Sequence, residues 1–209
     1  MSKFNLITHP ILQHKLTKMR EKDTNSIGFR GLMNEIGKFL AFEATRNIET
    51  ETFEIETPLA KTLGIRPKKY PMVVSIMRAG NGMLDGVLET LPYASAGHIG
   101  IYRDKFINNT VEYYFKLPAD SKGRDVILLD PMLATGDTMI AAIDRLKQYN
   151  VGKITLLSVL VSPQGLERLH YFHPEVEIFA LSKEEGLNEK GYLLPGMGDA
   201  GDRLYNTTK

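Results

Sequence analysis

The residues best suited to chemistry lie where a short apolar run ends in an acid and gives way to small residues. The run Val126–Leu129 precedes Asp130, and the chain then turns through Leu133–Thr138. Apolar residues recur at helical spacing from Met139 onward, so the pattern predicts a strand, a tight loop and a helix start. Such a loop directs backbone N–H groups and the positive end of a helix dipole at one point, which suits a phosphate. The carboxylate of Asp130, at the strand end, suits a sugar hydroxyl or a divalent cation.

A strand-to-helix junction without any ligand is the alternative. Gly136 would then supply the turn, and Thr138 would cap the helix with its hydroxyl. The local pattern fits both interpretations equally, so other segments have to decide between them.

Two arginines stand at the ends of other predicted strands. Arg78 follows the buried run Met72–Met77, a position where a guanidinium can hold phosphate oxygens bidentately. Arg103 stands where the run from His98 meets a polar hairpin. Taken singly, Arg78 fits a solvent-facing turn residue equally well. Arg103 on its own fits a surface charge cluster better than an anion contact.

The segment from Gly191 to Arg203 is rich in glycine and small residues. Such a composition near a C-terminus often means a flexible tail. Here the apolar residues 192–194 precede the glycines and Pro195 stiffens the entry, so an ordered loop is at least as well supported. A loop of this kind offers backbone N–H and C=O groups at close range to a flat heterocycle.

Composition and motifs exclude several function classes. Lys and Arg number 26 and Asp and Glu 25, so the net charge of +1 provides no strong field for nucleic acid or an acidic membrane. The absence of Cys excludes disulfides and thiolate zinc sites and agrees with a reducing compartment. The sequence has no signal-peptide pattern and no apolar run of about 18 residues, so we expect a cytoplasmic protein. His170 and His173 lack a third metal ligand nearby, and Walker and nucleophile-elbow motifs do not occur.

The elements that must position these residues alternate along the chain. Amphipathic helices are expected at 11–20 and 31–46. The expected strands are 52–56 (half-buried), 72–77, 98–103, 111–116, 126–130, 153–161 and 176–181, and the later helices are 80–91, 138–149 and 163–170. The polar segment 104–110 predicts an exposed hairpin arm. This order predicts a single α/β domain over residues 1–209, with a mainly parallel central sheet, flanking helices and ligands at the carboxyl ends of the strands.

Four segments in this order are specific enough to suggest a family, and they are Arg78–Gly80, Gly100–Asp104, Asp130–Gly136 and Gly198–Arg203. Through them the chain resembles the uracil-specific members of the type I phosphoribosyltransferase family across nearly its whole length. The resemblance implies a pentosyltransferase of pyrimidine salvage, which transfers the ribose 5-phosphate of phosphoribosyl diphosphate (PRPP) to N1 of uracil. The products would be UMP and diphosphate, and Mg²⁺ would bind mainly through PRPP.

The resemblance also implies a role for each site residue. The loop Leu133–Thr138 would hold the 5-phosphate through backbone N–H groups and two threonine hydroxyls, and Asp130 would meet the ribose hydroxyls. Arg78 and Arg103 would contact the diphosphate, whereas the loop 193–200 would bind uracil mainly through main-chain atoms. The implied catalytic residues are Asp130, Arg103 and Asp199, the last close to PRPP or its Mg²⁺. The implied substrate-binding residues are Arg78, Arg103, Asp130, Pro131, Met132, Leu133, Ala134, Thr135, Gly136, Asp137, Thr138, Leu193, Gly198, Asp199 and Ala200.

Two single residues and one tripeptide depart from the pattern that the resemblance implies. Asp137 stands where glycine is expected. A solvated carboxylate repels a nearby phosphate by roughly 1 kcal/mol, so we expect the Asp137 side chain to point outward. Asn81 replaces an apolar residue, and Ser182-Lys183-Glu184 replaces small residues. These changes bear on affinity or regulation rather than on the reaction.

Two other functions share the expected fold. A regulator that binds a nucleotide and RNA would need a basic face, which the charge balance disfavours. A transferase for a purine would need a larger pocket than the uracil-type loop implies. As partners we expect uracil and PRPP, GTP as a candidate effector, and no nucleic acid or membrane. The N-terminal amphipathic helices offer a surface for a homo-oligomer, a dimer or higher.

Overall fold

The computed structural model describes residues 3–104 and 109–207, without the side chains of residues 103, 104 and 109. Its centre is a seven-stranded sheet in the order β1-β11-β9-β7-β4-β5-β6, in which only β6 runs antiparallel to its neighbour. The strands are β1 (Phe4–Leu6), β4 (Met72–Met77), β5 (Ala96–Asp104), β6 (Asn109–Lys116), β7 (Val126–Leu129), β9 (Ile154–Leu157) and β11 (Glu177–Ala180). The predicted mainly parallel sheet is confirmed.

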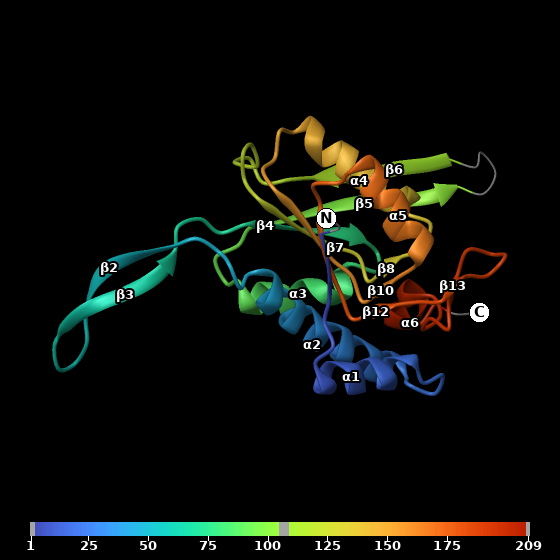
Figure 1. Cartoon of the computed structure of the whole chain (residues 1–209), viewed down its shortest axis with the longest axis horizontal. Coiled ribbons are helices and arrows are strands. Elements are labelled where there is room, and N and C mark those ends of the chain that lie inside the picture. The colour runs from blue at the N-terminus through green and yellow to red at the C-terminus, as the bar shows by residue number, and fades with distance from the viewer. Residues whose placement is uncertain (1–2, 105–108, 208–209) are drawn as a thin grey trace.

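Helices cover both faces of this sheet (Figure 1). One face carries α1 (Pro10–Arg20), α2 (Ser26–Ala44) and α3 (Asn81–Thr90), and the other carries α4 (Asp137–Gln148) and α5 (Pro163–Phe172). In β7, Ile127 packs with the first group and Leu128 with the second, because successive strand residues point to opposite faces. A strand buried on both faces must be apolar throughout, which explains the unbroken run. Within the described residues, no helix is long and apolar enough to cross a membrane.

The predicted strand 153–161 is interrupted at the carboxyl edge of the sheet. There the chain forms a second, three-stranded parallel sheet of β8 (Met132–Leu133), β10 (Leu160–Val161) and β12 (Ser182–Lys183). Pro131 has no N–H to continue the ladder, and its carbonyl accepts hydrogen bonds from the N–H groups of both Val159 and Leu160, at 2.9 and 3.0 Å. The short strands β8, β10 and β12 thus follow β7, β9 and β11 and pair beside the carboxyl edge of the main sheet, where the predicted site residues lie.

Two hairpins differ in how well the sequence predicted them. The β5–β6 hairpin is confirmed up to the pair Asp104 and Asn109, and the rest of the predicted arm lies outside the described residues. The predicted strand at 52–56 is confirmed, but its predicted half-buried character is wrong. Among the described residues, β2 (Thr50–Glu56) pairs only with β3 (Lys61–Pro67), is mostly exposed and projects from the body (Figure 1). Strand β3 was not predicted, since Gly64 and Pro67 are residue types that strands usually avoid.

Helix α2 begins earlier than the predicted start at residue 31. Asn25 caps the helix by accepting a hydrogen bond from the N–H of Gly28 at 2.9 Å. Asn is among the preferred N-cap residues, so the extra turn has a local cause.

The C-terminal part is an ordered loop between a short hairpin and a helix. The hairpin pairs β13 (Gly186–Leu187) with β14 (Leu193–Leu194), and α6 (Ala200–Tyr205) follows. We call residues 193–199 the C-terminal loop. Gly196 has φ +67°, and a Cβ placed on it would lie 2.2 Å from the carbonyl oxygen of Leu193. Only glycine fits such a turn.

Candidate active site

A cavity of about 340 Å³ lies at the carboxyl edge of the sheet. Its walls come from the ends of β4, β5 and β7, from residues 133–138, which we call the β8–α4 loop, and from the start of α6. Nine predicted site residues line it, namely Arg78, Asp130, Met132, Leu133, Ala134, Thr135, Gly136, Thr138 and Asp199. The fold therefore brings together segments that are far apart in the sequence.

Seven further lining residues were not predicted, and they are Ile76, Met77, Ala79, Ile101, Tyr102, Met139 and Gly201. Most are apolar or small residues at strand or helix ends. In the sequence they are indistinguishable from core residues. Each lies close in the chain to a predicted site residue, and Ala79, Ile101, Tyr102 and Gly201 lie within the segments that carry the family resemblance.

The β8–α4 loop is held from behind by α5. The hydroxyl of Ser162 donates a hydrogen bond to the carbonyl of Ala134 at 2.6 Å, and the Ser162 N–H donates to the carbonyl of Leu133 at 2.9 Å. A Cβ on Gly165 would lie 2.2 Å from the Ala134 oxygen, so the helix and the loop are in close contact. The loop carbonyls are thus occupied on the far side, and the loop presents its other face to the cavity.

The start of α4 supplies the electrostatics of an anion site. Gly136 caps the helix with φ +87°, so the alternative in which Thr138 is the N-cap is wrong. The N–H groups of a first helical turn have no intrahelical acceptor, and the helix dipole is positive at this end. Because Gly136 and Thr138 both line the cavity, this helix start faces it.

Asp137 does not line the cavity, in agreement with the expectation that its side chain points away from it, but the carboxylate is paired and not left in solvent. Its carboxylate lies 2.7 Å from Nη1 of Arg168 on α5, and its side chain is only 20% exposed. The hydroxyl of Thr135 donates a hydrogen bond to the same carboxylate at 2.9 Å. Asp137 is therefore paired with a cation, and the Thr135 hydroxyl is directed at Asp137.

Asp130 stands partly buried at the end of β7. Its side-chain Oδ1 accepts a hydrogen bond from the N–H of Met132 at 3.1 Å, and its carbonyl accepts one from the hydroxyl of Ser158 at 2.5 Å. Burial raises the pKa of Asp130 to about 7, and the Met132 N–H opposes this shift. Any hydroxyl donor or cation beside this carboxyl would stabilise its ionised form and lower its pKa.

Arg78 and Asp199 form the wall next to α6. Arg78 is 53% exposed, its Nη2 lies 3.3 Å from Oδ1 of Asp202, and its guanidinium lies 5.7 Å from the ring centroid of Tyr205. Asp199 caps α6, because its Oδ1 accepts a hydrogen bond from the N–H of Asp202 at 2.9 Å. Both side chains are thus held by α6 at the cavity.

Several predicted residues do not line the cavity, namely Pro131, Asp137, Leu193, Gly198 and Ala200. Pro131, Leu193 and Ala200 are buried, so their side chains serve packing. The backbone of Arg103 lies in β5 opposite Thr110, and its side chain falls outside the described part of the chain.

The unusual residues at 81 and 184 have structural explanations. Asn81 opens α3, and its side-chain oxygen accepts a hydrogen bond from the buried hydroxyl of Ser75. Glu184 is buried and paired with Arg20 from α1. Neither side chain lines the cavity.

Comparison with known proteins agrees with this geometry. Residues 6–207 match the family described as uracil phosphoribosyltransferase. The uracil phosphoribosyltransferase of Legionella pneumophila strain Philadelphia 1 is 52% identical over 204 residues, which cover 97% of this chain and 95% of the relative. That of Polaromonas naphthalenivorans is 48% identical over 208 residues, 99% of this chain and 100% of the relative.

Two solved structures extend the comparison to the fold. The AQ2163 protein from Aquifex aeolicus has a TM-score of 0.92 at 35% identity, covering 98% of this chain and 99% of its own. Adenine phosphoribosyl transferase from Trypanosoma brucei has a TM-score of 0.61 at 15% identity, with 91% and 88% covered, and so shows a shared fold alone. On the sequence match and the cavity together, this chain belongs to the uracil phosphoribosyltransferase family.

Proposed function

We propose that this protein converts uracil and PRPP to UMP and diphosphate, as a pentosyltransferase of pyrimidine salvage. The observation that carries the proposal is the single cavity lined by the start of α4, Asp130, Arg78 and Asp199. A helix N-terminus, a guanidinium and two carboxylates suit a sugar that carries both a phosphate and a diphosphate. Family membership supports uracil as the accepted base.

The ribose 5-phosphate half of PRPP would bind at the β8–α4 loop. The N–H groups at the start of α4 and the hydroxyl of Thr138 would donate to phosphate oxygens. The hydroxyl of Thr135 would have to leave Asp137 to do the same. Asp130 would accept hydrogen bonds from the ribose hydroxyls, which favours its ionised form and offsets the effect of burial.

The diphosphate and the base would occupy the other walls. Arg78 would contact the leaving diphosphate, and we propose the same for Arg103 from its position at the end of β5. Uracil would lie against the C-terminal loop and the start of α6, where Leu193, Gly198, Asp199 and Ala200 offer mainly backbone groups. A flat base edge is read well by backbone N–H and C=O groups at short range.

The reaction breaks the bond between ribose C1 and the diphosphate oxygen and forms the bond from C1 to N1 of uracil, and the N1 proton is released. Positive charge develops on the ribose as the diphosphate departs, so the protein has to stabilise the anion that leaves. We propose that Arg78 and Arg103 perform this task. Holding both substrates in one cavity supplies much of the remaining rate gain, so no covalent nucleophile is required.

We propose Mg²⁺ as the cofactor, bound mainly through PRPP. Among the described residues, no group of three or more His, Cys, Asp and Glu is arranged to hold a metal ion. Asp130 and Asp199 are the carboxylates on the cavity wall, and they fit a cation that PRPP brings with it. When bound, Mg²⁺ supplies charge neutralisation of the diphosphate.

The remaining proposals concern the setting of the enzyme. We propose a single domain over residues 1–209, a cytoplasmic location, a homo-oligomer, and GTP as an effector. Exposed apolar side chains on α2 (Ile27 and Phe42) and on the β2–β3 hairpin (Leu59, Leu63 and Ile65) support association between copies. Light scattering of the purified protein tests the oligomer, and assays with and without GTP test the effector.

The decisive experiment measures UMP formation from PRPP, Mg²⁺ and uracil, beside cytosine, adenine, guanine and hypoxanthine. We expect turnover with uracil alone, abolished in Asp130→Asn. Turnover with a purine would assign a different base specificity. Binding of UMP or PRPP without turnover on any base would favour the nucleotide-binding regulator.

A further inference from the structure

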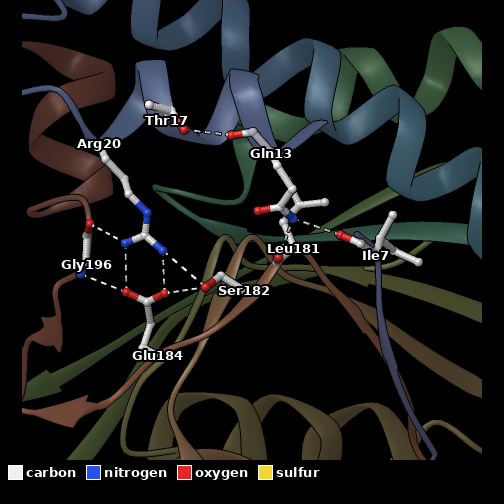
Figure 2. A network of polar contacts seen from close by, with 8 residues as sticks. All are labelled: Ile7, Gln13, Thr17, Arg20, Leu181, Ser182, Glu184 and Gly196. Carbon is white, nitrogen blue, oxygen red and sulfur yellow. Dashed lines mark hydrogen bonds and ion pairs between the residues drawn. The ribbon is translucent and has the colours of Figure 1, made fainter. Parts of the chain in front are cut away.

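A buried ion pair lies between α1 and the segment that leads to the C-terminal loop. The side chain of Glu184 is 1% exposed, and both of its oxygens face Arg20 at the end of α1, at 2.5 Å from Nη2 and 2.8 Å from Nη1 (Figure 2). Such a two-bond guanidinium–carboxylate contact fixes the orientation of both groups. It is built from residues far apart in the sequence.

The pair holds both polar ends of one loop residue, Gly196. Oε2 of Glu184 accepts the Gly196 N–H at 2.7 Å, and Nη1 of Arg20 donates to the Gly196 carbonyl at 2.7 Å (Figure 2). Gly196 is the position with φ +67° that only glycine fits, so a residue with a special backbone conformation is held at both its N–H and its carbonyl. The hydroxyl of Ser182 donates to Oε1 of Glu184 at 2.7 Å and completes the network.

Glu184 is charged in this environment. Burial raises its pKa, but hydrogen bonds from Arg20, Ser182 and the Gly196 N–H and the positive charge of Arg20 outweigh burial, and the net pKa lies below its usual value. A buried carboxylate that is fully hydrogen-bonded is a strong local constraint. Removal of Arg20 would leave the charge of Glu184 buried without its cation.

Helix α1, which carries Arg20, is itself anchored by other hydrogen bonds. The side-chain amide of Gln13 on α1 donates to the carbonyls of Ile7 and Leu181, at 3.0 and 2.8 Å, and so ties the helix to the sheet edge (Figure 2). Arg203 on α6 adds a second connection between the end of α1 and the C-terminal loop, because its Nη1 donates to the carbonyls of Met19 and Met197. The end of α1 is therefore anchored before it contacts the loop.

Gly196 lies close in sequence to a residue that lines the cavity. Two residues separate Gly196 from Asp199, which lines the cavity and caps α6. A shift of Gly196 would therefore be transmitted to the cavity wall on the side proposed for uracil. The wall formed by the β8–α4 loop is held separately, by Ser162.

We propose that Arg20 and Glu184 are positioning residues that hold the C-terminal loop in the conformation that binds the base. The inference rests on the proposed function in that uracil is taken as the ligand of this loop. Neither residue lines the cavity, so their effect on catalysis passes through Gly196. Loss of the pair should therefore weaken uracil binding and leave PRPP binding nearly intact.

The kinetic test compares KM for uracil with KM for PRPP in Glu184→Gln and Arg20→Lys. The amide of Gln can accept at one atom only, and Lys cannot make two parallel bonds to a carboxylate. We expect KM for uracil to rise roughly tenfold or more in Glu184→Gln, as loss of a charged hydrogen bond predicts. KM for PRPP should stay close to the parent value, and Arg20→Lys should show a smaller change in the same direction.

Two control variants separate positioning from loss of stability. Leu12→Ala removes a buried apolar side chain of α1 that takes no part in the hydrogen bonds of this network, and Lys18→Met removes an exposed partner of Glu21 on the same helix. Neither should change the ratio of the two KM values, although Leu12→Ala should lower Tm. An equal rise of both KM values in Glu184→Gln, or the same ratio in Leu12→Ala, would overturn the proposal.

Hydrogen exchange provides a readout that does not depend on activity. In Glu184→Gln, peptides that cover residues 193–199 should exchange faster than in the parent, whereas peptides that cover residues 133–138 should not. Absence of UMP formation by the parent protein would contradict the proposed function alone, and the exchange result would still decide the role of the pair. Unchanged exchange over residues 193–199 would contradict the positioning role, whatever the activity.

Discussion

The carboxylate of Asp137 lies 2.7 Å from the guanidinium of Arg168, and this pair joins the β8–α4 loop to α5. It explains how an acid is tolerated beside a proposed phosphate site, because the nearby cation offsets the repulsion at short range. Arg168→Ala is expected to raise KM for PRPP by about threefold to tenfold, since the negative charge at Asp137 then loses this cation. Steady-state assays at low ionic strength measure the effect, and added salt should reduce it.

A second substitution identifies the cause of that change. Asp137→Asn in the Arg168→Ala background should return KM for PRPP toward the parent value, because it removes the unbalanced charge. A double variant as impaired as Arg168→Ala would show instead that Arg168 acts through packing of α5 against the loop.

Asp130 is expected to lower the stability of the protein at neutral and alkaline pH. Its pKa is raised from 3.8 to about 7, so between these values the native state binds more protons than the unfolded chain. Stability from this group therefore falls as pH rises through that interval and is constant above it. Asp130→Asn should abolish activity yet increase the free energy of unfolding above pH 7, by at most about 4 kcal/mol.

Urea unfolding at pH 4, 6 and 8 checks this expectation. The difference between Asp130→Asn and the parent should be smallest at pH 4 and largest at pH 8. A difference that does not change with pH would mean that the gain does not come from the carboxyl's titration.

Arg78 should matter for binding and little for stability. It is 53% exposed, and its contact with Asp202 is long at 3.3 Å, so Arg78→Ala should leave Tm nearly unchanged. KM for PRPP should rise about tenfold to hundredfold, because one guanidinium contact to the diphosphate is lost.

Arg124 provides the opposite control for Arg78. Its guanidinium is mostly buried and donates to Ser95 and to the carbonyl of Tyr70 at 2.8 and 3.1 Å, away from the cavity. Arg124→Ala should lower Tm and leave KM for PRPP unchanged. The expectation for Arg78 fails if both variants lose stability and affinity together.

The contact between α5 and the β8–α4 loop predicts that Gly165→Ala displaces the loop. The new Cβ would lie 2.2 Å from the carbonyl oxygen of Ala134, so the backbone has to move. We expect KM for PRPP to rise and Tm to fall, by a destabilisation of about 1–3 kcal/mol. Differential scanning calorimetry and PRPP titration measure the two effects.

Gly31→Ala is a matched control, since Gly31 also lies in a helix but a Cβ there would meet no atom within 4 Å. It should raise stability slightly, because alanine favours a helix over glycine by about 1 kcal/mol. Equal losses in both variants would show that helix propensity, and not contact with the loop, determines the outcome.

Much of the candidate site followed from local patterns. The run before Asp130 and the small residues after it predicted a strand, a turn and a helix, and the order of such units predicted a parallel sheet. Because carboxyl ends of neighbouring parallel strands share an edge, Arg78 and Asp130 were expected near one another, and both line the cavity. These inferences succeed because hydrophobic spacing and turn chemistry act over a few residues.

Other features depend on which distant residues meet. Nothing in the local sequence joins Asp137 to Arg168 or Glu184 to Arg20, and nothing near Thr52 shows that its strand projects from the body. Side-chain pairing is decided by how helices and loops pack once the sheet has formed.

The sequence by itself thus determined the alternating elements, the parallel sheet and the position of Arg78 and Asp130 at strand ends, since each depends on local spacing. The fuller set of site residues came from the resemblance of four segments to a known family. Only the tertiary structure decided which charge is balanced by which partner and how the C-terminal loop is held. Those contacts join residues distant in the chain, and short-range patterns carry no information about such packing.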